Sequence, residues 1–131
     1  MSRLAAALVA CLALAACGED DEEPAAPAGS LADLTLTIDL DGEGSRPARR
    51  ATVRCERAED SAVCRAVARV PPKAFEPTPG NVACTQQYGG PQTATVEGTL
   101  RGEPVSAEFS RVNGCEIARW RDAAPLLGAA G

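Results

Sequence analysis

The chain has 131 residues, of which 45% are hydrophobic but only 3% aromatic, and its formal net charge is −5 at pH 7. A chain of this length folds as one domain at most, and so few aromatic side chains give that domain a thin core. The basic residues form no stripe and aromatics are scarce, so the composition argues against a nucleic-acid partner.

The N-terminus predicts export. Residues 1–16 have a basic start at Arg3 and then an apolar run that is too short to span a bilayer as a helix. The run ends in Leu-Ala-Ala-Cys17, which resembles the bacterial lipobox, where cleavage precedes a cysteine that receives lipid. The alternative is an ordinary secretory signal. We favour the lipobox because residues 18–23 turn abruptly polar. The lipoprotein would be anchored through Cys17 on the extracytoplasmic side of the membrane, since two acyl chains suffice for stable anchoring.

Residues 17–30 form a tether behind the lipidated Cys17. The tether carries five acids and two prolines and has no large apolar residue to bury. Residues 31–131 contain 13 acids and 12 bases, so the acidity of the chain belongs to the tether. The charge balance therefore predicts neither an acidic nor a basic partner for the folded domain.

Two strands are predicted at the start of the domain, which covers residues 31–131. Residues 34–40 alternate strictly between apolar and polar side chains, which is typical of a half-buried strand, and residues 41–44 end it. Residues 50–55 alternate more weakly and form a second strand. One side of that strand is expected to carry Ala51, Val53 and Cys55.

A short helix follows the second strand. Asp60 or Ser61 caps it, and it runs to Val70, where Pro71 and Pro72 stop it. Its apolar face is expected to be formed by three valines at helical spacing, Val63, Val67 and Val70.

The rest of the chain predicts a coil, a β-hairpin and an ambiguous tail. Residues 73–82 are expected to be irregular, and residues 93–100 alternate again before a turn at 101–103 and a returning strand. The tail after Ile117 is either a short helix interrupted at Pro125 or a loosely packed end. The order of elements predicts an α+β fold, in which a small antiparallel sheet carries one or two helices on one face.

Four cysteines remain once Cys11 leaves with the signal and Cys17 takes lipid. An even number of cysteines in an exported domain indicates two disulfides, and three pairings are open. We choose the sequential pairing. A zinc site is disfavoured because CxxC-type spacing and histidine are both lacking, and no metal or other cofactor is expected. The four residues are Cys55, Cys64, Cys84 and Cys115.

Residues 96–106, VEGTLRGEPVS, match the pattern V-x-G-x-x-x-G-x-x-V-S, and residues 113–115 match Asn-x-Cys. With the upstream elements, this ordered set resembles the subtilisin inhibitor-like proteins secreted by actinobacteria. The upstream elements are a strand ending in Cys55, a helix carrying Cys64 and the Cys84-x-x-x-Tyr88 loop. The resemblance implies the same sequential disulfides and, as a further partner, a second copy of the chain in a two-fold homodimer.

The resemblance implies substrate-like inhibition of a serine protease. Gln86 would occupy the primary specificity pocket and Gln86–Gln87 would be the scissile bond, with Cys84 and Thr85 on the acyl side. The expected partner is an extracellular or envelope protease of the subtilisin type. The leaving side would be formed by Gln87 and Tyr88. The reactive loop would extend to Gly89, and Asn113 would support it. Tyr88 also has a second interpretation, as a packing residue of the core or hairpin.

The sequence departs from the family at several positions. Gly89-Gly90-Pro91 replaces the aspartate and proline that follow the loop tyrosine, and two permissive glycines are expected to loosen the loop. The loop between Cys55 and Cys64 is short, and no closing aromatic strand is recognisable after Ile117. Gln86 is neither basic nor large and apolar, which disfavours a trypsin-like pocket. The alternative function is a non-inhibitory lipoprotein module that binds a partner and keeps the fold.

An enzyme is disfavoured by the inventory of reactive side chains. The chain has no histidine to act as general base and a single lysine, Lys73. The serines of the mature chain have no base to activate them, and Ser61 is better explained as a helix cap.

Overall fold

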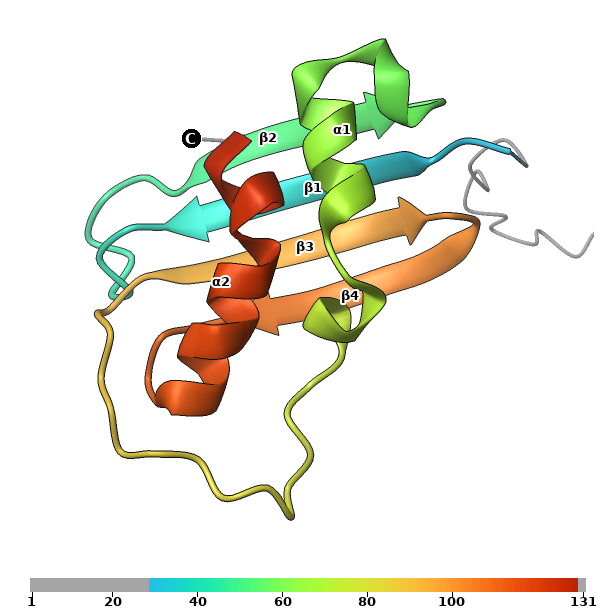
Figure 1. Ribbon diagram of the computed structural model, residues 1–131. Coiled ribbons are helices and arrows are strands. Elements are labelled where there is room, and N and C mark those ends of the chain that lie inside the picture. The colour runs from blue at the N-terminus through green and yellow to red at the C-terminus, as the bar shows by residue number, and fades with distance from the viewer. Residues whose placement is uncertain (1–28, 130–131) are drawn as a thin grey trace, which may run out of the picture.

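The alternating segment at the start of the domain forms β1 (Ala32–Asp39), which buries its apolar side chains and leaves its polar ones partly exposed. The computed structural model describes residues 29–129, so the signal segment, Cys17 and most of the tether lie outside it. β1 pairs with β2 (Arg49–Cys55) and β3 (Thr93–Leu100), and β3 pairs with β4 (Glu103–Phe109). The result is a four-stranded antiparallel sheet in the order β2-β1-β3-β4 (Figure 1).

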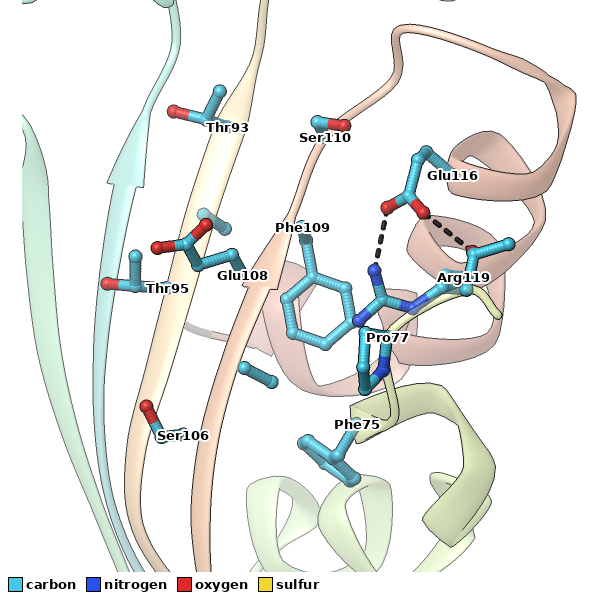
Figure 2. A pocket seen from close by; sticks show the side chains of 13 residues that line it. Phe75, Pro77, Thr93, Thr95, Ser106, Glu108, Phe109, Ser110, Glu116 and Arg119 are labelled. Carbon is cyan, nitrogen blue, oxygen red and sulfur yellow. Dashed lines mark hydrogen bonds and ion pairs between the residues drawn. The ribbon is translucent and has the colours of Figure 1, made fainter. Parts of the chain in front are cut away.

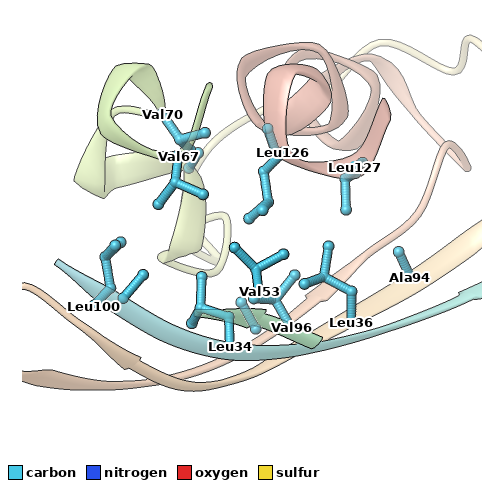
Figure 3. Packing of buried hydrophobic residues seen from close by; sticks show 14 of the residues in the cluster. Leu34, Leu36, Val53, Val67, Val70, Ala94, Val96, Leu100, Leu126 and Leu127 are labelled. Carbon is cyan, nitrogen blue, oxygen red and sulfur yellow. The ribbon is translucent and has the colours of Figure 1, made fainter. Parts of the chain in front are cut away.

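Two helices, α1 (Ala62–Arg69) and α2 (Gly114–Ala129), cover one face of this sheet. Ser61 is the N-cap of α1, since its hydroxyl accepts a hydrogen bond from the backbone N–H of Cys64 at 3.0 Å. Side chains of both helices point at the sheet from the same side, and the core between them is almost entirely aliphatic (Figure 3). The predicted α+β fold is therefore confirmed.

The expectation of irregular coil over residues 73–82 was wrong at its start. Residues Pro72–Phe75 form a 3-10 helix, η2, and another, η1 (Ala58–Asp60), precedes α1. A proline fits the first turn of a helix, where its missing N–H has no partner to lose. The single buried side chain of η2, Ala74, fixes it against the core.

The ambiguous tail forms α2, a helix of 16 residues that continues through Pro125. Proline in a helix interior removes one hydrogen bond and crowds the preceding turn. Burial of Ala123, Leu126 and Leu127 on both sides of the proline opposes this loss, since all three are at most 4% exposed.

The two disulfides join the helices to the rest of the fold. Cys55–Cys64 links the end of β2 to α1, with the Cα atoms 5.6 Å apart. Cys84–Cys115 links the segment before β3 to the first turn of α2, with the Cα atoms 5.3 Å apart. The sequential pairing is confirmed.

Candidate functional site

An exposed irregular segment lies between Cys84 and Gly89, beside the second disulfide. All of the intervening side chains are exposed, and Tyr88 keeps 65% of its surface accessible. The interpretation of Tyr88 as a packing residue is therefore wrong. We call residues Gln86–Tyr88 the loop tip, residues 77–85 its N-terminal limb and residues 89–92 its C-terminal limb.

Three consecutive residues in the first turn of α2 hold the N-terminal limb. The backbone N–H of Gly114 donates to the carbonyl oxygen of Thr85 at 3.0 Å. Cys115 forms the disulfide to Cys84. Glu116 accepts a hydrogen bond at 2.7 Å from the hydroxyl of Thr78. The N-terminal limb is thus fixed at Thr78, at Cys84 and, directly beside the tip, at Thr85.

Arg111, in the connection between β4 and α2, holds the C-terminal limb twice. Its carbonyl oxygen accepts a hydrogen bond from the backbone N–H of Gly89 at 2.7 Å. Its guanidinium donates to the side-chain oxygen of Gln92 at 3.1 Å. The sequence had given no reason to single out Arg111, because its role depends on a contact between segments 22 residues apart.

The two glycines expected to loosen the loop each have a steric role. A Cβ atom at residue 89 would lie 2.9 Å from Cγ1 of Ile117, so glycine allows the backbone to approach α2 closely. Gly90 has a φ of +130°, a conformation that other residues rarely adopt. Both positions fix the path of the limb, and the hydrogen bond at Gly89 restrains it further.

Asn113, the predicted support of the loop, makes its side-chain hydrogen bond elsewhere. Its Oδ1 accepts from the backbone N–H of Glu116 at 3.0 Å, so Asn113 caps the N-terminus of α2. Its support of the loop is indirect, because the turn that it caps carries the three attachments of the N-terminal limb.

Glu116 connects that turn to the hydrophobic core. Its second carboxylate oxygen pairs with the guanidinium of Arg119 at 2.7 Å, and both side chains are only 14–16% exposed. Arg119 lies over the ring of Phe109 at 5.1 Å, which places the pair beside β4 (Figure 2). Nε of Arg119 is buried and has no hydrogen-bond partner in the described part of the chain. The charge of this arginine is balanced by Glu116, which pairs with the other end of the guanidinium.

Two carboxylates of the described residues have pKa values that neighbouring groups lower. The hydroxyl of Ser45 lowers the pKa of Asp41 to about 2, and the backbone N–H of Arg57 lowers the pKa of Asp60. Both carboxylates stabilise turns of their own segments. Within residues 29–129, no cluster of three or more metal-binding side chains occurs, and neither helix is long and apolar enough to cross a bilayer.

Comparisons of the chain with models of protein families, with curated proteins and with solved structures found no match. The resemblance to the subtilisin inhibitor-like proteins therefore rests on the motifs of the chain alone.

We predict that Glu116→Ala lowers the free energy of unfolding by about 1–3 kcal/mol, because Arg119 then keeps a largely buried charge without its partner. Asp122→Ala is the matched control on the same helix. It removes an exposed ion pair to Lys73, in which the charged atoms are 3.9 Å apart, and should cost about 0–1 kcal/mol. Urea unfolding of both variants measures the difference, and equal losses would contradict the bracing role of Glu116.

Proposed function

We propose that the chain inhibits subtilisin-like serine proteases by presenting Gln86–Gln87 as a substrate-like bond. The observation that supports this most directly is the attachment of the exposed tip on both sides. Thr85 is held by Gly114 before the bond, and Gly89 is held by Arg111 after it. A flexible loop would be an ordinary substrate, whereas a restrained one loses little conformational freedom when it enters a cleft.

The same attachments provide a reason why cleavage would not release the protease. Hydrolysis of Gln86–Gln87 would leave the new carboxylate next to Thr85, within two residues of the Cys84–Cys115 disulfide. The new amine on Gln87 would lie two residues from Gly89, which stays bonded to Arg111. Both new ends would remain close together, so religation competes with dissociation of the two halves.

Gln86 sets the expected class of protease. A trypsin-like pocket offers a buried carboxylate that a neutral amide leaves without a charged partner. A pocket of the subtilisin type lacks this requirement and accepts the uncharged side chain with modest affinity. Residues 77–92 include no histidine, lysine or carboxylate that could act as a general base, and we propose binding to a protease and no enzymatic activity.

The alternative function is a non-inhibitory binding module with the same fold. The polar side chain of Gln86 favours it, because most of the free energy of such complexes comes from a residue that fills its pocket well. The anchor at Cys17 lies outside the described residues, and membrane attachment through it stays a prediction, as does the homodimer.

We predict that the purified protein inhibits subtilisin at micromolar concentration or below. Gln86→Lys should strengthen inhibition of trypsin by at least roughly tenfold, because the ammonium group then meets the pocket carboxylate. Steady-state assays with chromogenic peptides measure both inhibition constants.

The matched control for that experiment is Gln87→Lys, which places the same charge one residue beyond the proposed bond. It should leave trypsin uninhibited. If this variant inhibits trypsin and Gln86→Lys does not, the scissile bond follows residue 87 instead of residue 86. Failure of the unmodified protein to inhibit subtilisin would favour the binding-module alternative.

We further predict different outcomes for loss of the two disulfides. Removing Cys84–Cys115 with paired Cys→Ala substitutions should convert the inhibitor into a substrate that subtilisin cuts completely, because the N-terminal limb loses its covalent attachment. Removing Cys55–Cys64 in the same way should lower stability by about 2–3 kcal/mol and keep inhibition at temperatures where the variant is folded. Mass spectrometry during incubation with the protease measures how much of each variant is cut. Equal cleavage of the two variants would count against the role of Cys84–Cys115 in holding the inhibitory loop.

A further inference from the structure

Four large apolar side chains are exposed in the described part of the chain, and three of them belong to the loop or to the segment beside it. Tyr88 lies in the loop tip and Val82 in the N-terminal limb, with exposed fractions of 65% and 48%. Val112 is 56% exposed and lies in the connection between β4 and α2, outside the loop. The fourth, Leu40, is 44% exposed and lines a shallow pocket with Trp120 and Leu127.

Two backbone hydrogen bonds place Val112 next to the loop tip. One joins Gly89 to Arg111 at 2.7 Å, and the other joins Thr85 to Gly114 at 3.0 Å. Val112 follows Arg111 in one segment and Tyr88 precedes Gly89 in the other. Val112 and Tyr88 both lie between these two hydrogen bonds, each beside one partner of the first bond, so the two residues are neighbours across the adjoining segments.

Folding of the domain does not account for an apolar side chain at residue 112. More than half of Val112 is accessible, and it does not belong to the cluster of side chains that forms the core. The charged group next to it in sequence, the guanidinium of Arg111, is bonded to Gln92. Exposed apolar side chains that gather beside a proposed contact segment are typical of the centre of a protein interface.

We infer that Val112 contacts the protease together with Tyr88, on the leaving-group side of its cleft. The contact surface would then be formed by two separate segments, the loop tip and the β4–α2 connection. This inference rests on the proposed function. The partner that covers Val112 would be the apolar rim of the cleft of a subtilisin-like protease. Val112 would contribute affinity without taking part in the scissile bond.

The test is the inhibition of subtilisin by Val112→Ala in the otherwise unmodified protein. We expect a roughly tenfold rise in the inhibition constant, seen mainly as faster dissociation of the complex, with an unchanged melting temperature. Val112→Ile keeps an apolar side chain and should inhibit within about twofold of the unmodified protein. Leu40→Ala is the matched control, because it truncates a similarly exposed apolar side chain away from the loop. It should leave the inhibition constant unchanged.

The outcomes separate this inference from the proposed function. Inhibition by the unmodified protein with no change in Val112→Ala would overturn the second contact segment and leave the function intact. Equal weakening by Leu40→Ala, or a fall in melting temperature that accompanies the loss in Val112→Ala, would also overturn it. Absence of inhibition by the unmodified protein would remove the proposed function and this inference together.

Discussion

The first turn of α2 is the constraint on which the exposed loop depends. Gly114, Cys115 and Glu116 each hold a different point of the N-terminal limb, through a backbone hydrogen bond, a disulfide and a side-chain hydrogen bond. The turn is itself fixed, because Asn113 caps it and Arg119 ties Glu116 to the ring of Phe109. The position of the loop is therefore set by the packing of a helix on a sheet.

That packing comes from a small, aliphatic core. Six of the seven largest fully buried side chains are leucines or valines, and an edge-on aromatic pair, Phe75 with Phe109, adds to them. A core of this kind gives a domain of about 100 residues a narrow margin of stability. On the chain-entropy model the two disulfides contribute about 2–3 and about 3–4 kcal/mol, and the larger share comes from the bond that also holds the loop. The same covalent bond thus serves both stability and the proposed function.

The sequence predicted what depends on local pattern and missed what depends on contacts between distant segments. Alternation located β1 and β3, and a serine before an apolar helical face located the start of α1. The long α2 was not predicted, because Pro125 interrupts its pattern and its stability comes from burial of Leu126 and Leu127. Arg111 was missed because its main contact uses a backbone carbonyl, which every residue has. The two glycines after Tyr88 were expected to be flexible, and only the path of the folded chain shows why Gly89 must be small.

The equilibrium between intact and cut protein tests the two-sided attachment most directly. Subtilisin in trace amount would be incubated with the intact protein and, separately, with protein already cut at Gln86–Gln87, and both forms would be quantified by mass spectrometry. If both ends stay in place, the two incubations converge on the same mixture, because the cut bond is resealed as well as hydrolysed. A cut form that never regains the intact bond, or that is degraded further, would contradict the account.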